Sequence, residues 1–385
     1  MQDSSYSQWV RETLALARKD GARLIPLFDS HPAEPVELLR NVVDQAFSSP
    51  ITDRYTSAFS SGNPFVVANL AARYNRDPSN ILTTTGATNA ISILYRALLE
   101  PGDRILIESP AFDLFHDLAG VGRYEIDLIE RRAPFYNVDP FELAALIQPN
   151  TKLVILSNLH NPTGALFSRK DLLALASVAE QAGVHILFDE VYLGYADPSA
   201  RVAAANLSKW FISINSLTKM YALSTLRCGW IVADPAVIDR ARNVADRVEF
   251  GVSNLAHSVA ALVLEDSTSF AEYCLGIVEA ARPVMTRFYG LWHKEGLVEG
   301  RMPDYGCVSF PKLVGISDTT AFASSLLRNS GVIVAPGEYF GAPGHVRIGH
   351  AKPNNLLEEA LDALTTELRS WRAAGVPAVT QGAWM

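Results

Sequence analysis

The sequence predicts an α/β protein with a mostly parallel central sheet, helices on both faces of it, and a smaller α+β region at the C-terminal end. Five short, almost continuously apolar runs alternate with longer segments of helical periodicity, and this alternation stops near residue 282. Of the 385 residues, 49% are hydrophobic and 19% are charged, which excludes a disordered chain. A chain of this length favours two domains.

Each of the five apolar runs has the length of a strand and the composition of one buried on both faces. The runs are 104–108 (RILIE), 152–157 (KLVILS), 184–189 (VHILFD), 210–215 (WFISIN) and 229–233 (GWIVA). Helices are predicted over 87–99, where apolar residues recur at helical spacing, and over 168–182. The second helix opens with Ser168 and Asp171 at capping-box spacing and is followed by Gly183. Strands that alternate with such helices indicate a largely parallel sheet.

The pattern changes from about residue 282 onward. Predicted helices there are 284–294, 318–329 and 355–373, and predicted short strands are 307–310, 331–334 and 346–348. We therefore expect three regions: an N-terminal arm (1–45) that packs on the small domain or on a partner subunit, a large α/β domain (46–281), and a small α+β domain (282–385). Residues from Gly375 onward are expected to form a terminal tail.

Charge and cysteine content narrow the expected partners. The chain has a net charge of −8 and therefore lacks the positive electrostatic field that nucleic-acid binding requires. Cys228, Cys274 and Cys307 are far apart and odd in number, so we expect neither a disulfide framework nor a metal site. The first ten residues show no signal-peptide pattern, and no run reaches the roughly 18 apolar residues of a membrane helix. These features predict a soluble cytoplasmic protein.

The segment 216–230 (SLTKMYALSTLRCGW) joins two predicted strands and contains a single lysine, Lys219. Desolvation at such a position lowers the pKa of the amine and frees it as a nucleophile. Schiff-base chemistry requires such an amine. Ser216 and Arg227 flank the lysine and are suited to bind one phosphate. The alternative is a solvated lysine near a structural arginine.

Three further segments lie at strand ends or at a helix start. Asp189 ends a predicted strand, where α/β sheets hold ligands, and its carboxylate can keep a ring nitrogen protonated. Tyr192 can donate a hydrogen bond to a phenolate oxygen. The segment 157–164 (SNLHNPTG) predicts a tight turn around Asn161, and 83–88 (TTTGAT) presents free backbone N–H groups to a phosphate. Ordinary caps and turns also explain each segment taken alone.

In their order along the chain, these segments resemble the class I/II aminotransferases, which are fold-type I enzymes that use pyridoxal 5′-phosphate (PLP). The matching segments are 86–88 (GAT), 110–112 (PAF), 160–164 (HNPTG), 189–192 (DEVY), 216–219 (SLTK), Arg227, 336–341 (PGEYFG) and 346–349 (VRIG). The resemblance covers roughly residues 50–370. It implies a fold-type I transferase with bound PLP.

The resemblance also implies a role for each matching residue. Lys219 would be the Schiff-base lysine that moves the proton, Asp189 would pair with the pyridinium nitrogen, and Tyr192 with Asn161 would contact the ring oxygen. Arg347, together with Asn161, would bind the α-carboxylate of the substrate. The remaining cofactor contacts would be Phe112 stacked on the ring and a phosphate cup made of Gly86, Ala87, Thr88, Ser216, Arg227 and Tyr55. Tyr55 would reach the neighbouring subunit of a homodimer.

The implied activity is transfer of the amino group of an L-α-amino acid to a 2-oxo acid by a ping-pong mechanism. The same residues serve PLP-dependent elimination, decarboxylation or ring closure, as in capreomycidine synthase, so a lyase or cyclase is the alternative. A non-catalytic PLP-binding regulator is a remote one. The segment 27–34 (LFDSHPAE) lacks the usual glycine-containing substrate loop. Phe28, His31 and Tyr339 are therefore only candidates for the side-chain pocket.

Overall fold

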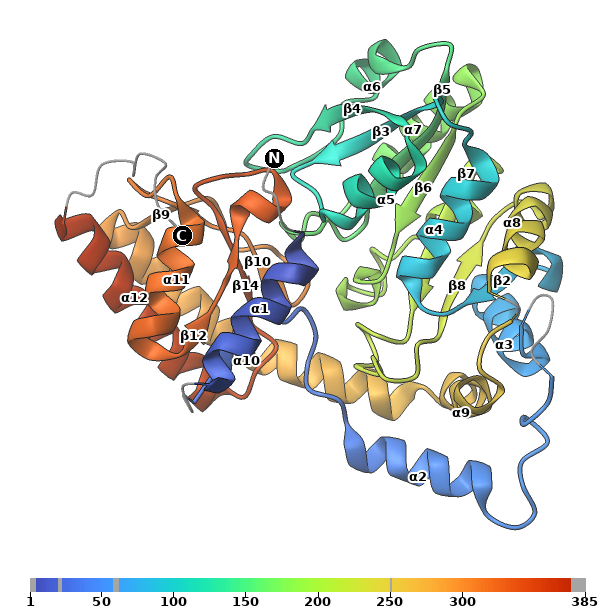
Figure 1. Cartoon of the computed structure of the whole chain (residues 1–385), viewed down its shortest axis with the longest axis horizontal. Coiled ribbons are helices and arrows are strands. Elements are labelled where there is room, and N and C mark those ends of the chain that lie inside the picture. The colour runs from blue at the N-terminus through green and yellow to red at the C-terminus, as the bar shows by residue number, and fades with distance from the viewer. Residues whose placement is uncertain (1–4, 20–22, 58–61, 250, 375–385) are drawn as a thin grey trace.

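A seven-stranded sheet forms the centre of the molecule (Figure 1). The computed structural model describes residues 5–19, 23–57, 62–249 and 251–374. The strands lie in the order β2-β8-β7-β6-β5-β3-β4. They are β2 (Ile81–Thr84), β3 (Arg104–Ser109), β4 (Glu125–Glu130), β5 (Thr151–Ser157), β6 (His185–Asp189), β7 (Phe211–Ser216) and β8 (Gly229–Val232). Strands β3 to β7 pair in parallel, and β8 is antiparallel to both of its neighbours.

The five predicted strands are all present, and their ends differ from the prediction by no more than one residue. Strands β2 and β4 were not predicted. β4 is the edge strand next to β3, and most of its side chains are partly or fully exposed. An edge strand of this kind does not carry the continuous apolar run that reveals a buried strand.

Helices cover both faces of the sheet because alternate side chains of the central strands point to opposite sides. Ile155 of β5 packs with α4 (Ala87–Leu98), α5 (Leu114–Gly122) and α8 (Pro235–Val248). Its neighbour Leu156 packs with α6 (Pro140–Leu146) and α7 (Arg169–Ala182). The predicted capping box of α7 is formed, and Gly183 ends the helix in a left-handed conformation. A third core contains α3 (Pro64–Tyr74) and α9 (Asn254–Glu265).

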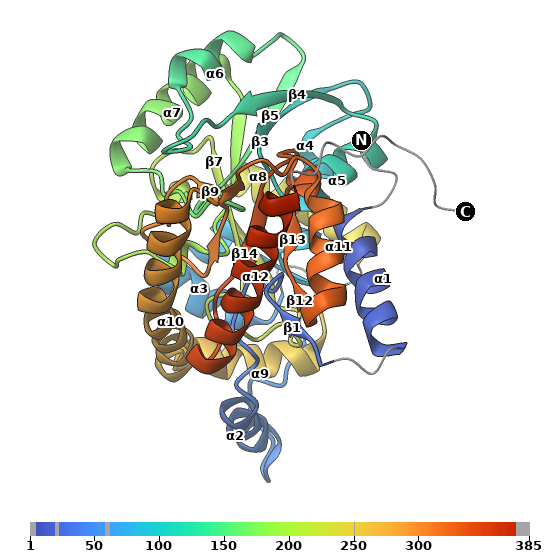
Figure 2. The same cartoon turned by 90° about the vertical axis from the view of Figure 1, so that its left-hand side faces the viewer.

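The C-terminal part is built around α10 (Thr268–Glu295), which is longer than the predicted helix over 284–294 and includes Pro283. Figure 2 shows α10, α12 (Asn354–Ala374) and α11 (Thr319–Ser330) side by side. They cover the antiparallel sheet β10-β14-β13. The short elements here are β9 (Val298–Glu299), β10 (Val308–Ser309), β11 (Lys312–Leu313), β12 (Val332–Ile333), β13 (Ala335–Pro336) and β14 (Val346–Gly349). The expected tail from Gly375 lies outside the described residues.

The N-terminal segment packs against this C-terminal part. β1 (Ile25–Pro26) pairs in parallel with β12, and Tyr6 of α1 (Tyr6–Lys19) lies in an aromatic core with Phe310 and Phe340. In contrast, α2 (Val36–Phe47) projects from the body (Figure 1). The remaining elements are single 3₁₀ turns: η1 (Pro78–Asn80), η2 (Leu193–Tyr195), η3 (Ala204–Asn206) and η4 (Gly337–Phe340). No helix within the described ranges is long and apolar enough to cross a membrane.

Candidate active site

A cavity of about 440 Å³ opens where β6 and β7 end, between the central sheet and the N-terminal segment. Its wall includes ten of the predicted site residues: Ala87, Thr88, Phe112, Asn161, Asp189, Tyr192, Ser216, Lys219, Arg227 and Arg347. A larger cleft of about 660 Å³ lies among residues 133–137, 163–168 and 299–305, and none of the predicted site residues line it. The chemistry-bearing side chains therefore converge in the smaller cavity.

Lys219 lies on the loop between β7 and β8, with its amine inside the cavity. Burial, followed by repulsion from Arg347, lowers the pKa of this amine to about 8. Its Nζ donates a hydrogen bond to Oγ of Ser30 at 2.7 Å and lies 5.4 Å from the ring centre of Tyr192. The shift increases the fraction of the amine that is unprotonated near neutral pH, and a nucleophile or a base requires the unprotonated form.

Asp189 is the last residue of β6 and faces the same cavity. Burial raises the pKa of its carboxyl to about 6. Oδ1 accepts a hydrogen bond from the backbone N–H of Val191 at 3.2 Å, so the carboxylate retains capacity for a cationic N–H donor. Tyr192, three residues on, is also buried, and burial raises the pKa of its phenol. The hydroxyl therefore stays protonated and able to donate.

The N-terminus of α4 carries the features of a phosphate-binding site. Gly86 caps this helix with φ +82° and supplies no side-chain hydrogen bond to its first N–H groups. A Cβ at Gly86 would lie 2.6 Å from Nη2 of Arg227, and a Cβ at Gly229 would lie 2.4 Å from the backbone of Gly86. Glycine at both positions lets the helix terminus and the guanidinium approach one point, close to the buried Ser216.

Arg347 on β14 has a buried guanidinium that donates hydrogen bonds to neutral groups. Its Nη1 donates to Oδ1 of Asn161, and its Nη2 donates to the hydroxyl of Tyr6 and to the carbonyl of Phe28, each at 2.9 Å. The rings of Tyr6 and Phe340 lie 5.4 and 4.8 Å from Cζ. Nε has no hydrogen-bond partner, and none of the ion pairs among the described residues includes Arg347. Because an uncompensated buried charge is costly, the site is suited to receive a carboxylate.

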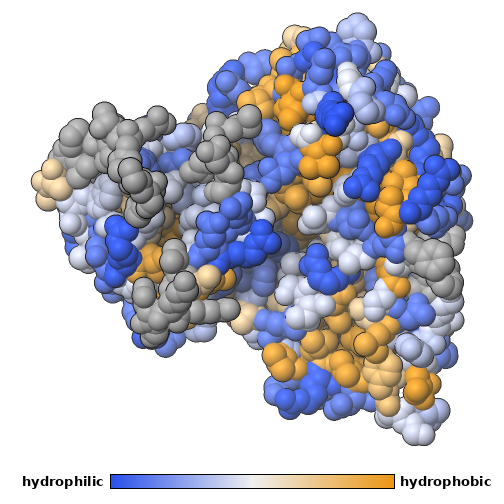
Figure 3. All heavy atoms as spheres, viewed as in Figure 1, coloured by the Kyte–Doolittle hydropathy of each residue, from blue (hydrophilic) through white to orange (hydrophobic). Residues whose placement is uncertain are grey.

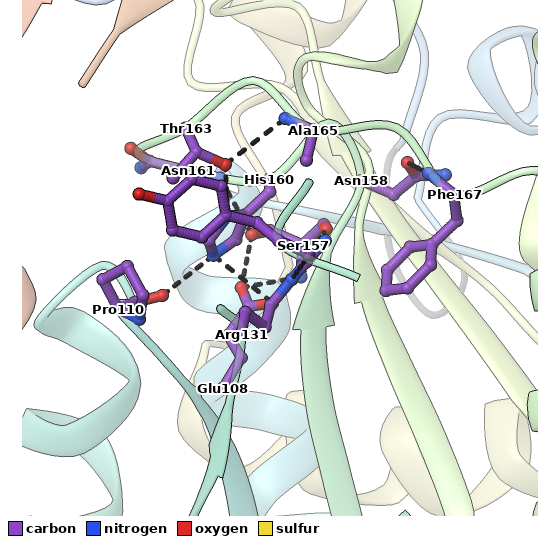
Figure 4. A network of polar contacts seen from close by, with 11 residues as sticks. Glu108, Pro110, Arg131, Ser157, Asn158, His160, Asn161, Thr163, Ala165 and Phe167 are labelled. Atoms are coloured by element: carbon purple, nitrogen blue, oxygen red, sulfur yellow. Dashed lines mark hydrogen bonds and ion pairs between the residues drawn. The ribbon is translucent and has the colours of Figure 1, made fainter. Parts of the chain in front are cut away.

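A buried polar network holds Asn161 in place (Figure 4). The backbone N–H of Asn161 donates to Oγ of Ser157 at 3.0 Å, and Ser157 donates from its backbone N–H to Glu108 at 2.8 Å. Glu108 also pairs with Arg131 at 2.6 Å, and both side chains are fully buried. His160 contacts the carbonyl of Pro110 at 2.8 Å. Sequence reasoning missed the pair of Glu108, near the end of β3, and Arg131, which directly follows β4.

The N-terminal segment contributes residues that no motif indicated. Tyr6 and Ser30 line the cavity, as do the candidates Phe28 and His31. Tyr339 does not line it and packs instead against Tyr6 and Trp9, at ring distances of 5.9 and 5.5 Å. A segment that lacks the usual glycine loop thus still forms one wall of the cavity.

Two predicted cofactor contacts lie outside the cavity wall. Gly86 precedes Ala87 in the chain and lies next to the guanidinium of Arg227, but it does not line the cavity. Tyr55 is 50% exposed and packs on Phe47 at 5.8 Å. Its predicted role is toward the cofactor of a neighbouring subunit, which this single chain does not test.

The donor set as a whole fits PLP. The amine of Lys219 can react with the aldehyde of PLP, and the buried carboxylate of Asp189 can pair with the ring nitrogen. The hydroxyl of Tyr192 and the amide of Asn161 can contact the ring oxygen. The N-terminus of α4 with Arg227 is suited to bind the phosphate, and the buried Arg347 is suited to bind a substrate carboxylate.

Comparisons with known proteins identify the family of the chain. Residues 39–364 match the family model of aminotransferase class I and II. An aspartate aminotransferase of Streptomyces avermitilis is 29% identical over 343 residues, which is 83% of either chain. The capreomycidine synthase of Streptomyces vinaceus is 26% identical over 371 residues, which is 94% of this chain and 92% of that one. A solved PLP-dependent aminotransferase from Streptococcus suis matches with a TM-score of 0.84 and 27% identity, covering 94% of this chain and 97% of that one. The chain belongs to the class I and II aminotransferases, and it is a PLP-dependent aminotransferase of fold type I.

Proposed function

We propose that this enzyme moves the amino group of an L-α-amino acid to a 2-oxo acid with Lys219 as its proton carrier. One observation carries the proposal: the amine of Lys219, the carboxylate of Asp189 and the buried guanidinium of Arg347 share one cavity. A reacting α-amino acid needs all three groups, because its carboxylate must be held while its α-proton is removed.

The proposed roles follow from the contacts of each side chain. Bound PLP supplies the electron sink for the reaction. Arg347 and Asn161, already joined by a 2.9 Å hydrogen bond, orient the α-carboxylate. Nζ of Lys219 takes up the α-proton, as its pKa of about 8 allows. The charge of Asp189 keeps the ring nitrogen protonated, and the hydroxyl of Tyr192 donates to the ring oxygen.

The phosphate cup is proposed to consist of the backbone at Gly86, Ala87 and Thr88 with the side chains of Ser216 and Arg227. The uncapped start of α4 supports it. Phe112 is proposed to stack on the ring. It lines the cavity, and its ring centre lies 6.1 Å from that of Tyr6, which also contacts Arg347.

A homodimer with shared sites is part of the proposal. Apolar residues gather on the lower part of the face in Figure 3, over α2 and α9. Val36 of α2 and Leu255 of α9 are 57% and 58% exposed, and Ile51, which follows α2 in the chain, is 57% exposed. Exposed apolar residues grouped in this way are typical of a contact with another chain. Tyr55, half-exposed and outside its own cavity, would act across that contact. Sedimentation of the active enzyme as a monomer would contradict the dimer.

A cytoplasmic setting is likewise proposed. The three cysteines of the chain are free and buried. Unpaired cysteines are usual where the compartment is reducing.

The alternative chemistry is a ring closure or another PLP reaction. It is favoured by the match to capreomycidine synthase, which spans 94% of this chain. The absorption spectrum of the PLP-loaded enzyme, recorded before and after a panel of amino acids, separates the two. Loss of the yellow Schiff-base band with release of a 2-oxo acid supports transamination. A persistent band with a cyclised product, ammonia or CO₂ supports the alternative. Lys219→Ala is the control and should neither form the band nor turn over.

A further inference from the structure

We propose that Ser30 is a positioning residue for Lys219: its hydroxyl holds the amine of the lysine whenever that amine is free. Nζ of Lys219 donates to Oγ of Ser30 at 2.7 Å, and Ser30 itself is buried. No motif of the family resemblance includes Ser30. The inference rests on the proposed function, in which Lys219 is released from the cofactor and then carries a proton.

The backbone that carries Ser30 is fixed against β14, the strand that bears Arg347. The N–H of Gly349 donates to the carbonyl of Leu27 at 2.6 Å, and the thiol of Cys307 donates to the carbonyl of Ser30 at 3.3 Å. A Cβ at Gly349 would lie 1.6 Å from the carbonyl oxygen of Asp29, so the two backbones touch. The hydroxyl of Ser30 is therefore held at a set place relative to Arg347.

The surroundings of Lys219 explain why its free amine needs this partner. A buried ammonium requires hydrogen-bond acceptors, and Arg347 repels it. Ser30 also contacts the side chain of Tyr192. Burial raises the pKa of that phenol, and the hydrogen bond with Ser30 partly offsets this rise. One hydroxyl thus links the amine to the proposed donor for the ring oxygen. Ser30 neither forms nor breaks a covalent bond.

Other charged and titratable groups also face Lys219. They are Arg347 on β14, Asp189 on β6, Cys307 just before β10, and Asp29 and His31 of the N-terminal segment. His31 is neutral near pH 7, because burial, followed by Lys219, lowers its pKa. The hydroxyl of Ser30 is the neutral group that accepts a hydrogen bond from Nζ of Lys219.

The first test measures the amine itself. The full chain is loaded with pyridoxamine 5′-phosphate, which has no aldehyde and leaves Lys219 free. Its pKa is then read from pH-dependent acetylation followed by mass spectrometry. Ser30→Ala removes an acceptor from the ammonium, so we expect the pKa of Lys219 to fall by about one unit, a tenfold change in acid dissociation. Ser258→Ala is the matched control, because it removes another buried hydroxyl, one that donates to the carbonyl of Leu255 at 2.8 Å. An unmoved labelling curve in Ser30→Ala would overturn the proposal.

The second test measures turnover. Ser30→Ala should lower kcat about tenfold and leave the KM for the amino acid within about twofold, because Arg347 still holds the substrate. Ser30→Thr keeps the hydroxyl and should restore most of kcat. If Ser30→Ala keeps full kcat, or raises KM alone, the positioning role is refuted. A wild-type enzyme that binds PLP without transaminating would refute the proposed function, whereas the labelling result would still decide the contact between Ser30 and Lys219.

Discussion

Replacing Asp189 with asparagine is expected to stabilise the cofactor-free protein while weakening its hold on PLP. Asp189 is a buried carboxylate with one backbone hydrogen bond to Oδ1, from Val191 at 3.2 Å. Burial raises the pKa of this carboxyl from 3.8 to about 6. Asparagine has nearly the same shape and carries no charge, so it escapes the cost of burying an anion.

The magnitude follows from the shift in pKa. A rise from 3.8 to about 6 is about two units, which corresponds to roughly 3 kcal/mol of destabilisation when the carboxyl is ionised. The folded state has the higher pKa and takes up the proton first. The cost is therefore absent below about pH 4, grows as the pH rises through the folded pKa near 6, and is complete above it. Asp189→Asn should be more stable than wild type near pH 7 and nearly equal to it near pH 4.

Urea unfolding of both cofactor-free proteins at these two pH values measures the difference. Adding PLP should reverse the order near pH 7, because the wild type binds it more tightly and gains more stability from it. Asp239→Asn, at an exposed carboxylate on α8, is the control and should not show the pH-dependent gap. A cofactor-free Asp189→Asn that is less stable than wild type near pH 7, or a gap equal at both pH values, would refute the reasoning.

Two further substitutions test how the cavity binds the substrate, and a third tests the backbone contact that forms its wall. Arg347→Lys keeps the positive charge but loses the planar guanidinium that can bind a carboxylate through two hydrogen bonds. We therefore expect kcat/KM to fall about a hundredfold, which corresponds to a loss of roughly 3 kcal/mol of transition-state stabilisation. An equal loss toward an amine without an α-carboxylate would contradict this role. Tyr6→Phe removes one acceptor of that arginine and should raise KM about fivefold, for about 1 kcal/mol. A steady-state assay in which only kcat falls would oppose it. Gly349→Ala would place a Cβ 1.6 Å from the carbonyl oxygen of Asp29, so calorimetry should record a lower Tm. Gly276→Ala, in open space, should not lower it.

Local patterning predicted the middle of the sheet and missed its margins. Strands β3 and β5 to β8 are nearly continuous apolar runs because the chain buries them on both faces. In contrast, β4 (EIDLIE) lies at an edge with three of its six residues charged, and β2 has four residues, two of which are threonine. The helix that was predicted to begin at residue 284 begins at Thr268. Proline is more usual at the start of a helix, so Pro283 in the interior of α10 did not indicate that the helix continues before it.

Motif order predicted which side chains share the cavity but not what supports them. Lys219, Asp189 and Arg347 belong to motifs that follow or form strands, so a sheet of known topology brings them together. Tyr6 contacts Arg347 across a sequence separation of 341 residues, and Ser30 contacts Lys219 across 189. Contacts at such separations leave no periodic or local signal in the chain.

The pairing of β1 with β12 has a consequence for how the enzyme is made. β1 is synthesised long before its partner β12 and before Gly349 of β14. A chain released early would already contain Lys219 and Asp189, but it would lack Arg347 and the strands that seat Ser30. The wall of the cavity is therefore finished only after β14 has been synthesised. Cofactor capture by a fully formed pocket therefore cannot precede the synthesis of β14.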